Sequence, residues 1–308
     1  MDLDTDKSRY CFVHDKVREA AYGMIPGEDK DRFHFDVGMA LLSTYKRHVE
    51  GKNDMEGKSD GLFDIINQVN HGVPALLHDE SQRISVAKLN LQATAHTMQS
   101  YNYTSAYRYA KTAISLLPVD SWATHHDLSV EAYFQLAKSA YPCSKYEEAR
   151  DSLQQVLEHA SSLQMQTRLD VYDLLRLIIM SAGTPKDFGP FMVAMADVLR
   201  SLGEDLPSHD DAIFGFFWKL NVANQVYAAK KSFEKTTDAS LSNTDASGTE
   251  DAVVHAYTLL VRLTFMAKIN LFPYYVSRAV QYCLKSKVVS KYVPGKLKLI
   301  CASLISCD

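Results

Sequence analysis

The strongest constraint on the fold of this chain is its succession of amphipathic helical patterns, each closed by a helix-breaking residue. Apolar side chains recur three and four positions apart, which is the spacing of one helix face. Pro118 and Pro142 each stop such a pattern, because proline cannot continue the backbone hydrogen-bond ladder. Helices are expected over 28–45, 62–72, 80–100, 103–117, 122–141, 146–160, 166–182, 188–202, 210–233, 251–270 and 272–287. The chain is therefore predicted to be all-α, and 13 Gly and 9 Pro in 308 residues are few for a turn-rich β fold.

The apolar residues of two expected helices near the N-terminus predict which face each helix buries. A strand-like run from Tyr10 to Val13 leads into HDKVREAAYGMI, whose apolar face is marked by Val17, Ala20, Ala21, Met24 and Ile25. After Pro26 and Gly27, the next helix presents Phe33, Val37, Ala40 and Leu41. Gly72 is expected to cap the C-terminus of the helix that begins at Leu62.

Two neighbouring helix pairs resemble each other at an offset of about 43 residues. Tyr103-x-x-Ala106 aligns with Tyr146-x-x-Ala149. The same offset pairs Ala110 with Leu153, and Ile114 with Leu157. A small alanine lets two helices approach closely, and the aromatic ring fills the gap between neighbouring pairs. The repeat predicts a tetratricopeptide-like solenoid of helical hairpins over residues 62–235.

Three segments differ from this array. Residues 46–61 are charged, with scattered glycine, and are expected to form a solvated loop. Residues 236–250 are rich in Ser, Thr, Asp and Gly, the composition of a disordered insertion. Residues 251–308 are expected to hold further helices, the last of them truncated. The Lys-rich stretch over 285–298 could contact an acidic partner or a membrane surface, although we favour a solvated helix and loop.

Charge and cysteine content disfavour several classes of protein. The formal net charge is −4 and the pI is about 6.3, which argues against nucleic acid as a partner. The polar start of the chain is no signal peptide, and no apolar run of about 18 residues predicts a transmembrane helix. Five cysteines without a CxxC pair indicate neither a disulfide framework nor a zinc site, so a reducing, cytoplasmic location is expected.

The sequence lacks the common catalytic signatures. It holds no phosphate loop, no dinucleotide fingerprint, and no HExxH or GxSxG motif. We therefore assign no catalytic residue, no metal site and no cofactor within this chain, and expect that it is not an enzyme by itself. His125-His126-Asp127 is the most conspicuous polar cluster. Adjacent helical residues point to different faces, so a partly exposed helix face is favoured over a metal or acid–base site.

Several motifs, in the same order, resemble one family of large signalling proteins. YCFVHDKVREAAYGMIP is similar to its F-x-F-x-H-D-x-V-x-x-A-A-Y segment, and KDRFHFDVGMALL to its R-x-x-H-x-x-I-G-x-x-L-L. LFDIINQVNHG is similar to [IL]-F-[DE]-I-[VI]-N-Q-L-N-x-G, and the resemblance continues through LNLQATAHTMQSYNYTSAY to about residue 205. Proteins of this family join a protein-kinase-like domain, a STAND-class AAA-type ATPase, a long helical region, and often GAF and histidine-kinase modules.

The resemblance implies a place in a larger architecture. Residues 1–45 would be the tail of the winged-helix region of the ATPase module, and the helical array would follow it. Soluble adenylyl cyclases share a similar junction, so the output domain stays open. Because the chain begins just before the first motif and ends inside an expected helix, we expect a gene fragment or a degenerate paralogue.

The resemblance also supplies one pair of candidate site residues. Val13-His14-Asp15 is similar to the Met-His-Asp motif of STAND switches, in which the His approaches the β-phosphate of ADP and the Asp orients it. His14 and Asp15 are therefore candidate nucleotide-sensing residues, but only together with an upstream ATPase module that binds ATP or ADP. The alternative is that His14 caps its helix and Asp15 interacts with the helix dipole.

Two functional hypotheses follow. The first is a non-catalytic regulatory or protein-interaction module, whose helical surface binds a protein or sibling domains and biases the ATPase switch. The alternative is a piece of a multidomain histidine or serine/threonine kinase, or of an adenylyl cyclase-like enzyme, whose catalytic parts lie outside this chain.

Overall fold

The computed structural model describes residues 14–50, 59–73, 79–159, 163–204, 206, 248–267 and 271–286, and all regular structure among them is helical. The all-α prediction is thus confirmed for this part of the chain. The chain divides into two compact units, residues 1–139 and 140–308. The expected strand-like run at 10–13, the helix at 210–233, the insertion as far as residue 247, and the lysines after residue 286 lie outside the described residues.

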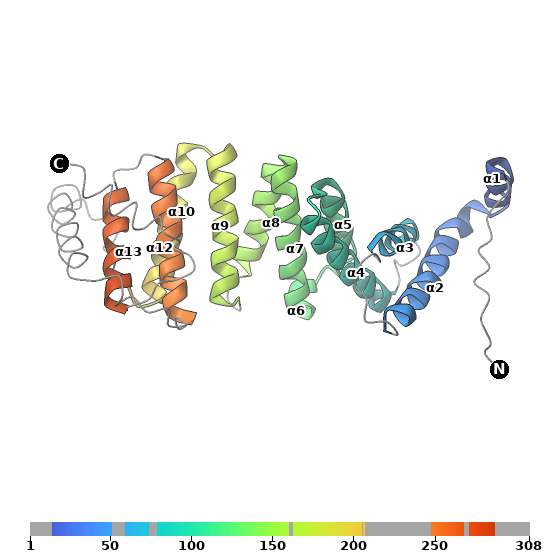
Figure 1. Ribbon diagram of the computed structural model, residues 1–308, viewed down its shortest axis with the longest axis horizontal. Helices are drawn as coiled ribbons and strands as arrows, with labels where there is room; N and C mark the ends of the chain where they lie inside the picture. Colours follow the sequence, from blue (N-terminus) through green and yellow to red (C-terminus); the bar gives the residue numbers. More distant parts are fainter. Residues whose placement is uncertain are drawn as a thin grey trace. The chain divides into compact units, whose positions relative to one another are not determined.

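The first unit is built from consecutive helices that pack on one another. In chain order these are α1 (Asp15–Gly23), the 3-10 turn η1 (Gly27–Asp29), α2 (Lys30–Glu50), α3 (Ser59–His71), α4 (Glu80–Gln99), α5 (Tyr103–Ser115), α6 (Ser121–Thr124) and α7 (His126–Ala140). Helix α3 lies against both α2 and α4, and α5 lies beside α4 (Figure 1). Helices α2 and α3 both extend into the expected loop at 46–61, and the expected helix at 122–141 is divided at His125.

The second unit is centred on one helix, α12, whose middle part is almost entirely buried. Its elements are η3 (Tyr141–Cys143), α8 (Tyr146–Glu158), α9 (Met165–Ala182), α10 (Pro185–Ser201), α12 (Gly248–Met266) and α13 (Phe272–Ser286). Helix α12 packs against α9, α10 and α13 (Figure 1). Tyr257, Leu260 and Leu263 are fully buried, because apolar residues occur around the whole circumference of α12.

A tight turn reverses the chain between α4 and α5. The Asn102 N–H donates to the Thr97 carbonyl at 2.9 Å, and the Tyr101 N–H donates to the Met98 carbonyl at 3.1 Å. Tyr101 adopts a left-handed φ of 58°. These two bonds and the left-handed residue define a Schellman motif, which satisfies the last carbonyls of α4.

The same turn recurs 43 residues later, before α8. The Lys145 N–H donates to the Ala140 carbonyl at 3.1 Å, the Ser144 N–H donates to the Tyr141 carbonyl at 3.0 Å, and Ser144 has a φ of 59°. In the helix that follows each turn, the fourth residue is a fully buried alanine, Ala106 or Ala149. The internal repeat of the sequence therefore has a counterpart in the backbone.

The buried face of α2 is not the face that the sequence analysis favoured. Phe33 and Leu41 are 45% and 46% exposed, so that prediction was wrong. Phe35 and Leu42 are buried instead, on the side where Gly38 meets α3. Helix α2 carries two apolar stripes, and α3 packs on the one whose glycine permits a close approach.

The apolar face expected for α1 is also exposed. No residue of α1 is buried among the described residues, and Val17 and Met24 are 56% and 84% exposed. Tyr22 links α1 to α2 through a 2.9 Å hydrogen bond between its hydroxyl and Nε2 of His34. The exposed large apolar residues of α1 and α2 thus include Val17, Met24, Phe33 and Leu41.

Two glycines set the distance between α2 and α3. A Cβ on Gly38 would lie 2.6 Å from Cγ2 of Val69, and one on Gly72 would lie 2.5 Å from Cβ of Phe35 and 2.6 Å from the Asp31 carbonyl oxygen. Gly72 does not have the left-handed φ of a glycine cap. Its role is therefore to admit the backbone of α2, which corrects the expectation that it caps α3.

Replacing Gly72 should therefore cost stability through overpacking. We expect Gly72→Ala to lower the free energy of unfolding by about 1–3 kcal/mol, because the new methyl group meets backbone atoms that cannot rotate away. Gly61→Ala in α3 is the matched control. A Cβ there meets nothing within 4 Å, so the better helix propensity of alanine should raise stability by up to about 1 kcal/mol. Urea denaturation of both variants tests this, and equal effects would contradict the close-approach argument.

Candidate interaction surface

The predicted pair His14 and Asp15 lies at the start of α1. The backbone of His14 is extended, and its Nδ1 accepts a hydrogen bond from the backbone N–H of Lys16 at 3.2 Å. Asp15 occupies the first turn of α1 and forms a 3.2 Å ion pair with Arg18. His14 is thus an N-cap, and Asp15 lies where a negative charge is favourable to the helix dipole.

The cap has a consequence for the imidazole of His14. Because Nδ1 accepts from Lys16, the neutral ring carries its proton on Nε2. An Nε2–H group can donate to an anion such as a phosphate. The capping bond holds the ring, whereas the Asp15 carboxylate is engaged by Arg18.

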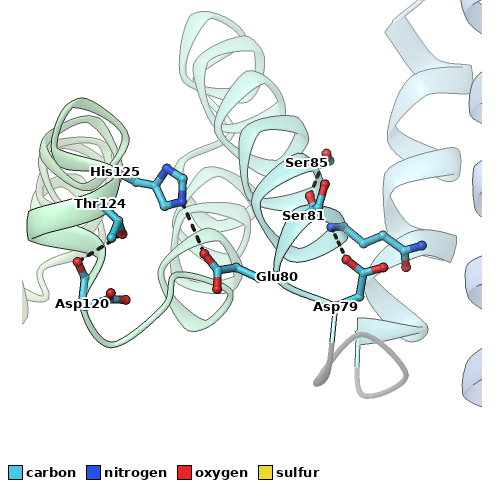
Figure 2. A network of polar contacts seen from close by, with 8 residues as sticks. Asp79, Glu80, Ser81, Ser85, Asp120, Thr124 and His125 are labelled. Carbon is cyan, nitrogen blue, oxygen red and sulfur yellow. Dashed lines mark hydrogen bonds and ion pairs between the residues drawn. The ribbon is translucent and has the colours of Figure 1, made fainter.

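A break in the helix at His125 separates this residue from His126 and Asp127, and Nδ1 of His126 lies 3.5 Å from Oδ1 of Asp127. His125 ends α6 with φ −136° and ψ 48°, and its Nε2 lies 3.6 Å from Oε1 of Glu80. Figure 2 shows the Glu80 side chain, at the start of α4, directed toward this ring. His126 instead lies against Trp122, with ring centroids 6.0 Å apart. The two imidazoles serve different contacts, and the described residues hold no cluster of three metal-ligating side chains.

A shallow groove runs between α4 and the α6–α7 segment beside this pair. It has a volume of about 630 Å³. Its charged lining residues are Lys88, Asp127 and Glu131, so the formal charge of its lining is −1 with His125 and His126 neutral. The groove therefore mixes charges of both signs.

A second groove, between α3 and α5, has a different electrostatic character. Its volume is about 580 Å³, and its lining residues are Asn67, Asn70, His71, Tyr107, Arg108, Tyr109, Lys111 and Thr112. Among the described residues that line it, Arg108 and Lys111 give a formal charge of +2 with His71 neutral, and none of these residues carries a carboxylate. We call it the α3–α5 groove.

Hydrogen bonds of side-chain amides join the helices that form the α3–α5 groove. Asn70 and the fully buried Asn90 exchange two 2.8 Å hydrogen bonds, which join α3 to α4. The Tyr109 hydroxyl donates to Oδ1 of Asn67 at 3.1 Å, which joins α5 to α3. Because these bonds are buried or half-buried, they fix the helices that carry the cations.

Each of the two cations lies near a tyrosine ring of α5. The Arg108 guanidinium carbon lies 5.9 Å from the ring centroid of Tyr109. Lys111 Nζ donates to the Tyr107 hydroxyl at 3.2 Å and lies 5.5 Å from the centroid of that ring. Both charged side chains are exposed, so they can reach a bound ligand. The sequence analysis did not select them, although the absence of acidic residues from 103 to 115 was a usable signal.

The second unit contains a partly buried polar triad around the fully buried Tyr257. The Tyr257 hydroxyl donates to the carboxylate of Glu204, and Nη2 of Arg278 lies 3.1 Å from Oε2 of the same carboxylate. Burial, and then the hydrogen bond to Glu204, raise the pKa of Tyr257 far above its ordinary value of 10.0. Glu204 follows Gly203, whose φ is 90°, so the turn after α10 is tied to both α12 and α13. The triad joins three elements of the second unit and is structural.

Comparison with known proteins yields one informative similarity. The chain is 25% identical over 172 residues to "Hybrid signal transduction histidine kinase G" of Dictyostelium discoideum, an alignment that covers 51% of this chain and 5% of that relative. No family model matches the chain, and no solved structure gives a significant match. The similarity indicates a relationship to signal-transduction proteins.

None of the described helices combines the length and the apolar character that a membrane span needs.

The buried tyrosines predict a loss of stability at alkaline pH. Burial, and then the neighbouring Tyr274, raise the pKa of Tyr275 to about 12, and the pKa of Tyr257 is higher still. Tyrosines in the unfolded chain ionise near pH 10, so above that pH the folded state binds more protons than the unfolded state and the free energy of unfolding falls.

We expect Tyr257→Phe to flatten this decline in the free energy of unfolding, and to cost about 1–3 kcal/mol at neutral pH through the lost hydrogen bond to Glu204. Tyr101→Phe, at an exposed position, is the control. Urea midpoints measured from about pH 8 to 11.5 test this, and parallel curves for all three proteins would contradict it.

Proposed function

We propose that this chain is a non-catalytic helical module that binds a protein partner within a signal-transduction protein. The observation that carries the proposal is the α3–α5 groove, an open surface whose cations are placed by a fixed frame of hydrogen-bonded helices. Its lining offers hydrogen-bond donors and positive charge. Such a surface suits recognition of a partner.

The proposal includes a tetratricopeptide-like arrangement of the helical hairpins. The recurrence of the Schellman motif before α5 and α8, each time followed by a buried alanine, supports it. In arrays of this kind each hairpin completes its core against its neighbours and presents its remaining surface to a ligand.

The proposal also includes coupling to a STAND-type ATPase switch. The exposed apolar residues of α1 and α2 support this, because a preceding domain would bury such residues. In a longer protein His14 would donate its Nε2–H to a phosphate of ADP. If His14→Ala leaves ADP retention unchanged in a protein that carries both an ATPase module and this chain, this part of the proposal fails.

The parent protein that we propose is a multidomain kinase. The similarity to a Dictyostelium hybrid histidine kinase supports it, and because the chain spans 5% of that relative, the kinase activity would lie outside this chain. An adenylyl cyclase-like parent is the alternative that the sequence resemblance leaves open.

The purified chain should therefore fold without turning over a nucleotide. We expect a helical circular dichroism spectrum and no ATP hydrolysis or autophosphorylation above a buffer blank. The assay should be repeated with the His14→Ala and His125→Ala variants. Turnover by the chain that one of these substitutions abolishes would contradict the non-catalytic proposal.

A further inference from the structure

We infer that the α3–α5 groove binds an acidic peptide segment, one that presents consecutive Asp or Glu side chains. This inference rests on the proposed function, since it names the partner chemistry for the same surface. Its basis is the formal charge of +2 on the described residues that line the groove, none of which carries a carboxylate.

The groove is built to receive carboxylates. Arg108 and Lys111 are three residues apart, so they lie on one side of α5 with a rise of about 4.5 Å between them. Arg108 presents a planar fork of donors and Lys111 a compact ammonium group, and both suit a carboxylate. The Tyr109 hydroxyl occupies Oδ1 of Asn67, so the group that Asn67 offers to a ligand is its NH₂ donor.

The neighbouring groove provides an internal contrast. It flanks the same α4–α5 hairpin and has nearly the same volume, but Asp127 and Glu131 oppose its one lysine, Lys88. An acidic segment would meet like charges there. Charge complementarity therefore selects the α3–α5 groove over a surface of similar size in the same unit.

A peptide fits this surface better than a nucleic acid does. Two permanent cations neutralise two charges, whereas a nucleic-acid site engages many phosphates with a wider basic surface. The whole chain carries a formal net charge of −4, which repels a long polyanion beyond the groove. A short acidic peptide can bind locally without meeting that repulsion.

The test is fluorescence anisotropy of a fluorescein-labelled hexaglutamate peptide titrated with the full chain. We expect saturable binding that weakens as NaCl is raised, and that becomes at least about tenfold weaker in the double variant R108Q/K111Q. The charge-preserving variant R108K/K111R should retain binding within about threefold. Lys88→Gln is the matched control, since it removes an exposed cation from the adjacent helix, and it should leave the Kd unchanged.

Each other outcome overturns the inference. No binding by the wild-type chain, or equal binding by R108Q/K111Q with an unchanged circular dichroism spectrum, would show that the groove does not bind the acidic peptide. A labelled hexathymidylate that binds as tightly as hexaglutamate and is lost in the same double variant would assign the groove to nucleic acid. These peptide-binding results do not affect the test for nucleotide turnover. A failure of the peptide inference is therefore distinct from a failure of the non-catalytic proposal.

Discussion

The local structure depends first on how the chain reverses between paired helices. In the Schellman motif after α4, the bond from Asn102 to Thr97 closes the helix and sets the direction of α5. Tyr101 adopts a left-handed backbone conformation, which costs conformational free energy for a residue with a Cβ and which glycine would adopt more easily. The same turn geometry recurs at Ser144, before α8, so two different side chains, Tyr101 and Ser144, adopt it.

Close approach of helices is the second requirement, and small residues meet it. Ala106 and Gly38 permit contacts that larger residues would block, and Asn70 and Asn90 then fix α3 against α4. For the proposed function, the consequence is that Arg108 and Lys111 project from a hairpin whose helices are joined to α3 by hydrogen bonds. Rigid placement lowers the conformational cost of binding a ligand.

Much of the helical pattern could be predicted from the sequence, because proline breaks and apolar spacing are local signals. The choice of a buried face was not local. Helix α2 has two apolar stripes, and only the contact of Gly38 with Val69 shows which stripe is covered. The groove was missed for the same reason, since Asn67 and Arg108 lie far apart in the sequence and meet only after α3 and α5 have packed. His14 could be located by motif, but its capping bond to Lys16 required the structure.

The central claim is that this chain acts by binding through the α3–α5 groove. Hydrogen–deuterium exchange with and without saturating hexaglutamate tests it most directly. The account predicts slower exchange over residues 67–71 and 107–112, while residues 123–131 beside the neighbouring groove exchange as before. Protection confined to residues 123–131, or bound peptide without any change at 67–71 and 107–112, would contradict it.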